Sequence, residues 1–152
     1  MSLPLIQILH RETEAVKAFA EALADEREVM KSGDAQALGA VLDRKTALAS
    51  ALAELGAARE AQMAAAGLRA GPNGMLVGLR IDPAVHQAWR TLRLAALGAH
   101  QASTLNSAVI ATHLEHTRAA IQVLRQRGID AGLYGRDGRT QNAASGLSLA
   151  RG

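Results

Sequence analysis

Cysteine is absent from the 152-residue chain, and aromatic residues are nearly absent. Without a thiol, the chain can form no disulfide, no thiolate nucleophile and no thiolate metal site. Phe19, Trp89 and Tyr134 are the only aromatic residues. The core must therefore be aliphatic and thin, since the large rings that dominate most protein cores are missing.

The β-branched residues are scattered and never alternate with polar residues over the length of a strand, which argues against a sheet. Alanine, the best helix former, dominates many stretches. These features predict an all-α fold of three long antiparallel helices that form a bundle or coiled coil, followed by a flexible C-terminal tail. The predicted helices cover about 4–32, 35–66 and 83–127, so that the bundle covers 1–127 and the tail 128–152.

The first two predicted helices carry apolar residues at the a and d positions of a heptad repeat. Polar residues interrupt this pattern, because Glu12 and Glu26 take d positions in the first helix and Lys45 lies in the seam of the second. Between the two helices, Gly33 suits a left-handed C-cap and Asp34 suits an N-cap. So short a connection forces the two helices to be antiparallel neighbours.

Four glycines and a proline lie between residues 67 and 82, a composition typical of a loop. The apolar run Met75–Leu79 within this segment is expected to dock on the bundle. Asp82 and Pro83 then predict a helix start, an N-cap followed by proline at the first helical position.

In the third predicted helix, only Gly98 interrupts residues 84–127, which as one helix would span about 66 Å. Its second half carries what we call the main stripe: Ile110, Leu114, Thr117, Ile121 and Leu124. A second stripe lies beside it: Leu94, Leu97, Leu105 and Val109. Two interpretations stay open at this point. The helix either extends beyond its shorter partners and offers the main stripe to another protein, or bends back near Gly98 and buries it.

The two halves of the chain differ in the sign of their charge. Residues 1–66 hold seven Lys/Arg and ten Asp/Glu, whereas residues 67–152 hold ten and four. The simplest interpretation is solvated faces on a bundle whose halves attract each other, with an acidic partner or nucleic acid as the alternative. A nucleic-acid-binding surface is disfavoured, because the ten basic residues are spread widely and no aromatic platform accompanies them.

Nothing in the sequence supports catalysis, a cofactor or a metal site. It contains neither a nucleophile elbow nor a phosphate-binding G-x-x-x-x-G-K-[ST] loop. His113 and His116 lie one helical turn apart with Glu115 between them, but the H-E-x-x-H spacing is not met and a third ligand is missing nearby. We therefore expect surface histidines and no enzyme.

The first nineteen residues, MSLPLIQILHRETEAVKAF, lack a basic start, and their apolar residues are spaced apart rather than continuous. This pattern is unlike that of a signal peptide or a membrane span. We expect a soluble protein of the cytoplasm that is not embedded in a membrane.

The stretch LNSAVIATHLEHTRAAIQVLRQRGIDAGLYGRDGRT resembles the C-terminal signature of FlgN-type flagellar export chaperones. A Tyr-Gly-x-Asp-Gly element after a helix is its most specific part. Upstream, LDRKTALASALAEL and the W-x-x-L of Trp89 and Leu92 also look like the family. One departure is Ser107–Ala108, where the family often has Asn-Gly. The residues of the Tyr-Gly-x-Asp-Gly element are Tyr134, Gly135, Asp137 and Gly138.

The resemblance implies a small, all-helical, cytoplasmic chaperone. Its implied partners are the hook-associated proteins of the hook-filament junction, of the FlgK and FlgL type, and the flagellar type III export apparatus, including the gate protein FlhA and the ATPase complex. The family's client-binding determinants lie in its C-terminal region. We therefore predict client contacts there, with the Tyr-Gly-x-Asp-Gly element as an anchor for the client or the export gate. The predicted contacts are Leu105, Asn106, Val109, Ile110, Leu114, Thr117, Ile121 and Leu124.

The main rival to this reading is a homo-oligomeric helical module, structural or adaptor in role, that hides its long third helix in a dimer. A basic nucleic-acid-binding protein is the weaker rival, and an enzyme is the weakest.

Overall fold

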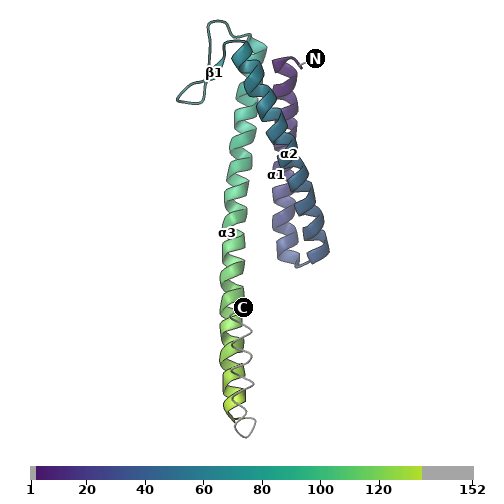
Figure 1. Ribbon diagram of the computed structural model, residues 1–152, viewed down its shortest axis with the longest axis vertical. Helices are drawn as coiled ribbons and strands as arrows, with labels where there is room; N and C mark the ends of the chain where they lie inside the picture. Colours follow the sequence, from purple (N-terminus) through teal and green to yellow (C-terminus); the bar gives the residue numbers. More distant parts are fainter. Residues whose placement is uncertain (1–2, 135–152) are drawn as a thin grey trace. The chain divides into compact units, whose positions relative to one another are not determined.

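The structure, a computed structural model, describes residues 3–134. Three long helices form almost all of this part of the chain, which confirms the predicted all-α bundle (Figure 1). The elements in chain order are α1 (Leu5–Ser32), α2 (Ala35–Ala65), β1 (Arg69–Ala70), β2 (Leu76–Val77) and α3 (Pro83–Tyr134). The chain divides into two compact units, and the boundary between Ser107 and Ala108 falls inside α3.

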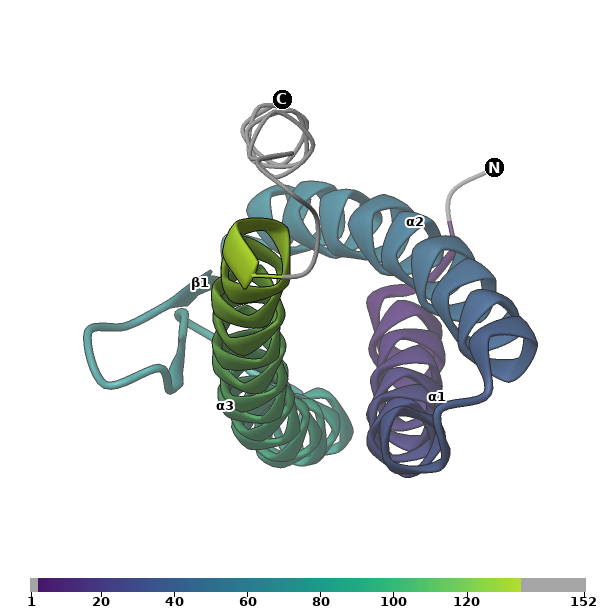
Figure 2. The same ribbon diagram turned by 90° about the horizontal axis from the view of Figure 1, so that it is seen from below.

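The connection between α1 and α2 is built as predicted. Gly33 adopts a left-handed conformation with φ of 73°, and its N–H donates to the carbonyl oxygen of Val29 at 3.1 Å. Asp34 caps α2, because its side chain accepts a hydrogen bond from the N–H of Ala37 at 3.0 Å. The two helices consequently lie side by side in opposite directions, as Figures 1 and 2 both show.

Two ion pairs join α1 and α2 at the polar positions of the heptad pattern. Glu12 accepts from Arg59 at 2.7 Å, and Glu26 pairs with Lys45 at 2.8 Å. Both carboxylates are at least nine-tenths buried. A carboxylate buried to that degree requires a partner, because an unpaired charge in an apolar seam costs several kcal/mol. The polar residues therefore sit in the interface as matched pairs.

The segment between α2 and α3 forms a short antiparallel hairpin, which the sequence did not predict. Arg69 lies opposite Val77, and Ala70 lies opposite Leu76. Each strand has only two residues, too few for any alternation of polar and apolar residues to appear. The predicted docking of the apolar run Met75–Leu79 holds for Leu76, which is 6% exposed and belongs to the core, whereas Val77 and Leu79 are exposed.

Trp89 connects the hairpin to the helices of the first unit. Its indole Nε1–H donates to the carbonyl oxygen of Gly74 at 2.9 Å, and the guanidinium of Arg59 lies 5.6 Å from its ring centroid. Arg93 adds a hydrogen bond to the carbonyl oxygen of Asn73 at 3.1 Å. The core around this point takes residues from every element except β1: Leu9, Val16, Met63, Leu68, Leu76, Ala88, Trp89 and Leu92.

Helix α3 differs from its predicted form at its C-terminal end. It continues through Gly98 without a break and past the predicted end at Arg127 to Tyr134. Gly128 lies within the helix: one glycine costs only about 1 kcal/mol relative to alanine, and the residues just before it, Arg125–Arg127, are good helix formers. The first seven residues of the predicted tail are thus helical, and the rest of that tail lies outside the described residues.

Replacing a core leucine should test this packing. Leu9 is 1% exposed within the core, so Leu9→Ala should lower the free energy of unfolding by about 2–5 kcal/mol. Leu42 is 44% exposed, so the same truncation there should cost less than about 1 kcal/mol. Urea unfolding followed by far-ultraviolet circular dichroism measures both. Equal losses in the two variants would contradict the assigned core.

Candidate functional site

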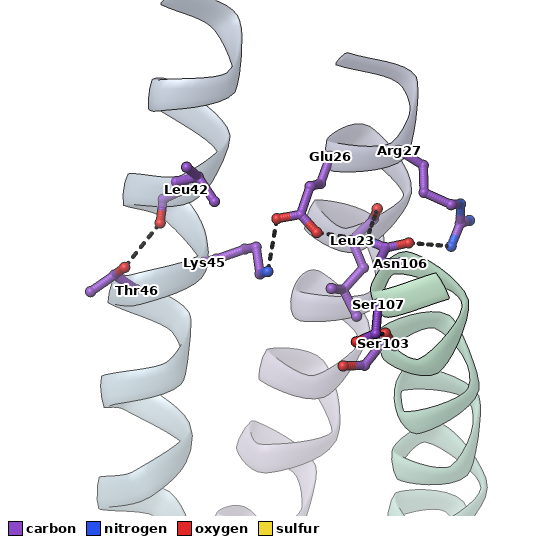
Figure 3. A network of polar contacts seen from close by, with 9 residues as sticks. All are labelled: Leu23, Glu26, Arg27, Leu42, Lys45, Thr46, Ser103, Asn106 and Ser107. Carbon is purple, nitrogen blue, oxygen red and sulfur yellow. Dashed lines mark hydrogen bonds and ion pairs between the residues drawn. The ribbon is translucent and has the colours of Figure 1, made fainter. Parts of the chain in front are cut away.

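A buried polar network joins α1, α2 and α3 in the first unit (Figure 3). The side-chain amide of Asn106 donates to the carbonyl oxygen of Leu23 at 2.8 Å and to Glu26 Oε1 at 2.7 Å. Its oxygen accepts from Arg27 at 2.9 Å. The second oxygen of Glu26 holds Lys45, so a single carboxylate contacts side chains of two other helices. Both polar atoms of the Asn106 side-chain amide therefore have hydrogen-bond partners: the nitrogen donates and the oxygen accepts.

The position of Asn106 corrects one of the predicted client contacts. Its side chain is 2% exposed and is held in this network, whereas a client contact needs an accessible surface. A buried polar residue in an otherwise apolar seam fixes the register of packed helices, since a shift along the helix would leave it unpaired. Asn106 therefore positions α3 against α1, and the remaining predicted contacts lie along the helix beyond it or on its exposed side.

The face of α3 that packs into the core of the first unit is the same face that carries the main stripe. Trp89, Leu92 and Asn106 are buried on it. Steps of three and four residues lead from Trp89 to Asn106, and the same steps continue from Asn106 to Ile110 and on to Leu124. A core-type repeat thus runs through the whole helix.

Within the second unit, the side chains of this repeat are exposed. The exposed fractions are 48% for Ile110 and Leu114, 44% for Ile121 and 65% for Leu124, and Thr117 is also exposed. Helix α3 runs through Gly98 without a break, so the bend at Gly98 that the alternative requires is not present. Four large aliphatic side chains on one helical face, each about half accessible, form a surface suited to a partner.

The second stripe is also accessible. Leu94 is 71% exposed, Leu97 55% and Leu105 51%, while Val109 is half-buried. Val123, 51% exposed, was missed by the sequence analysis. It follows Leu105 by eighteen residues, five helical turns, and so shares its side of α3. That spacing is readable from the sequence, but on this side of the helix no large apolar residue lies between Val109 and Val123, so the sequence shows no continuation of the second stripe.

The predicted Tyr-Gly-x-Asp-Gly anchor begins at Tyr134, the last residue that the structure describes. Helix α3 ends at Tyr134. The Tyr134 side chain and residues Gly135, Asp137 and Gly138 lie outside the described residues, so the anchor stays a prediction. Ser107–Ala108, the departure from the family pattern, lies in the regular helix of α3. The Ser107 hydroxyl donates to the carbonyl oxygen of Ser103 at 3.1 Å.

His113 and His116 are exposed on α3. Among the described residues, no three His, Cys, Asp or Glu side chains come together in a way that could hold a metal ion. Within the same residues, no helix combines the length and the apolar character that crossing a membrane requires.

Comparison with known families decides the assignment. The model of the family described as FlgN protein matches residues 1–142. The chain belongs to the FlgN family. The match covers the whole first unit and continues through the main stripe of the second. Neither a curated protein nor a solved structure matches the chain.

FlgN proteins are chaperones of flagellar protein export, and membership gives this chain that general role. FlgN is a family of chaperones rather than of enzymes, which agrees with a site made of apolar side chains and one structural polar network. Such a site is suited to binding a partner through reversible burial of apolar surface.

Removing the Asn106 amide should test the network. In Asn106→Ala, the carbonyl oxygen of Leu23 and one oxygen of Glu26 lose their donor, which should lower the free energy of unfolding by about 1–3 kcal/mol. Ser107→Ala is the matched control, because that exposed neighbour bonds only within its own helix, and its change should stay within about 0.5 kcal/mol. Urea unfolding of the two variants measures the difference. A control as unstable as Asn106→Ala would refute the positioning role.

Proposed function

We propose that this FlgN protein binds hook-associated proteins of the FlgK and FlgL type in the cytoplasm before their export. It keeps them unassembled and delivers them to the flagellar type III export apparatus, including FlhA and the ATPase complex. One observation carries the proposal: the face of α3 that forms core in the first unit continues through the second with its aliphatic side chains exposed. A helix with an unused core face is suited to complete a bundle with a helix from another protein.

The proposed client segments are the terminal helices of the junction proteins. Such segments are made for coiled packing in the assembled filament, and before assembly they are disordered, amphipathic and prone to associate. Pairing with the main stripe would cover their apolar face. The client contacts we propose are Leu105, Val109, Ile110, Leu114, Thr117, Ile121 and Leu124.

The expected affinity follows from the size of this surface. Full burial of an exposed leucine or isoleucine contributes about 1.5–3 kcal/mol, so a half-exposed side chain gains roughly half of that. The cost of ordering the client is several kcal/mol and offsets part of this gain. A complex of moderate affinity results, which can dissociate at the export gate without nucleotide chemistry in the chaperone.

A charge placed in the main stripe should test this function. Ile121→Asp puts a carboxylate in the middle of the proposed contact, so affinity for a purified FlgK-type protein from the same organism should fall about 100-fold. Gln122→Asp is the matched control, because that exposed residue lies about 100° around the helix from both Ile121 and Val123, on neither apolar stripe, and should keep the parent affinity. Isothermal titration calorimetry measures both dissociation constants. Parent-like binding by Ile121→Asp would overturn the proposed surface.

The rival function, a homo-oligomeric module, uses the same exposed face. Sedimentation velocity distinguishes the two, since a client-binding surface should leave the free chain monomeric or weakly associated. A stable dimer that Ile121→Asp dissociates, together with no binding of the junction protein, would favour the rival.

A further inference from the structure

A groove runs between α1 and the first part of α3, wholly within the first unit. It consists of two adjoining cavities of about 400 Å³ and 560 Å³ that share Lys17 and Thr91. We call it the α1–α3 groove. Small and apolar side chains make up most of its lining, chiefly Ile6, Ala20, Ala84, Ala88, Ala95 and Ala99.

The length of the groove matches a helix. Along α1 it extends from Ile6 to Glu21, about four helical turns or roughly 24 Å. Alanine-lined walls let a docked helix approach closely, because the distance between packed helix axes falls as the side chains at the contact become smaller. An amphipathic helix of about sixteen residues would lie along this length.

Gly98 is not explained by the packing of the described residues. A Cβ atom built on it meets nothing within 4 Å. Its φ is not positive, so the backbone does not need glycine either. Glycine weakens a helix interior, and one common reason to keep it is close approach of another backbone. Leu94, one turn before Gly98, lines the same cavity and is 71% exposed, so a large apolar side chain borders the bare backbone.

The charges on the edge of the groove favour one kind of helix. Glu14 pairs with Lys17 at 3.6 Å, whereas Glu21 makes no ion pair with any described residue. The opposite edge, on α3, has the uncharged Gln87 and Thr91. The α1 edge is therefore negative overall, which suits a helix that carries Lys or Arg on the flank facing α1.

We propose that the α1–α3 groove binds a second amphipathic helix of the client, with basic residues along the flank that faces α1. The inference rests on the proposed function, because it assigns the groove to the same client as the main stripe. Leu94 and Leu105 support this assignment: they are eleven residues apart, three helical turns, and so lie on one side of α3. The groove edge thus leads along the helix to Leu105, which is already one of the proposed client contacts.

Filling the groove tests the inference. A Cβ atom added at Gly98 meets nothing within 4 Å, so Gly98→Leu should place its side chain in the open space and weaken binding of the purified FlgK-type protein roughly tenfold or more. Gly39→Leu is the matched control, since Gly39 also lies in a helix with nothing within 4 Å of an added Cβ, but on α2 and outside the groove. It should keep the parent dissociation constant. Calorimetry measures binding, and circular dichroism confirms that both variants remain helical.

The charge of the edge is tested separately. Glu21→Lys should weaken binding several-fold and reduce its dependence on salt, because it reverses a carboxylate of the α1 edge that pairs with no described residue. Parent-like affinity and salt dependence in this variant would overturn the basic flank assigned to the client.

The outcomes separate the groove from the main stripe. If Ile121→Asp abolishes binding while Gly98→Leu binds like the parent, the groove inference is overturned and the proposed function stands. If Ile121→Asp also binds like the parent, the proposed function fails. If Gly98→Leu instead dissociates a dimer of the free chain, the occupant is a second copy and the client assignment is wrong.

A cysteine-based measurement keeps the test decisive if Gly98→Leu fails to fold. The chain has no cysteine, so the thiol introduced by Gly98→Cys is the only one present. Bound FlgK-type protein should slow its reaction with a maleimide, and should leave the thiol of Gly39→Cys unaffected. Equal reaction rates with and without the junction protein at Gly98→Cys would overturn the inference.

Discussion

The position of α3 in the first unit is fixed at two points: against the hairpin and α2 near its start, and against α1 further along. Near its start, Trp89 is held by the carbonyl oxygen of Gly74 and by the guanidinium of Arg59. Further along, Asn106 is held by Leu23 and Glu26. The chain is rich in alanine and has few aromatic residues. Packing of such small apolar side chains is similar in neighbouring helical registers, so apolar contact alone does not select one of them. Directional hydrogen bonds supply what the small side chains lack.

Because α3 is fixed in this position, one apolar face of the helix both forms core in the first unit and offers accessible side chains in the second. Up to Asn106 it is covered by the chaperone's own elements, and beyond it the same kind of side chain is accessible. The change from covered to accessible surface coincides with a fully matched polar residue, so the core ends without an unpaired group. A client helix that adds to the uncovered part would extend an existing apolar seam.

The sequence predicted those features that depend on local chemistry. The caps at Gly33 and Asp34 and the start at Pro83 follow from single-residue preferences, and the fold has all three. Lys45 in the second seam and Glu26 in the first were recognised as interruptions of the pattern, and their pairing explains both. Two features escaped prediction. Two-residue strands have no period, and α3 continues through Gly128 to Tyr134 although glycine is a weak helix former.

The candidate site was predictable only in part, because periodicity identifies an apolar face without saying whether anything covers it. The main stripe was found from its spacing, but its exposure required the coordinates. Asn106 was assigned to the client surface from its place in the motif, whereas its burial depends on Leu23 and Glu26, some eighty residues away in sequence. Long-range partners of this kind leave no mark on a single helix.

The burial of Trp89 affects how this chaperone can be observed. It is the only tryptophan, it is 7% exposed, and its indole is already hydrogen-bonded inside the first unit. Its emission therefore reports on the first unit, which holds the α1–α3 groove, and no tryptophan lies on the main stripe. A flat intrinsic-fluorescence titration with a partner protein would therefore leave binding at the main stripe untested, so optical studies of that stripe need a reporter placed on the partner or introduced into the second unit.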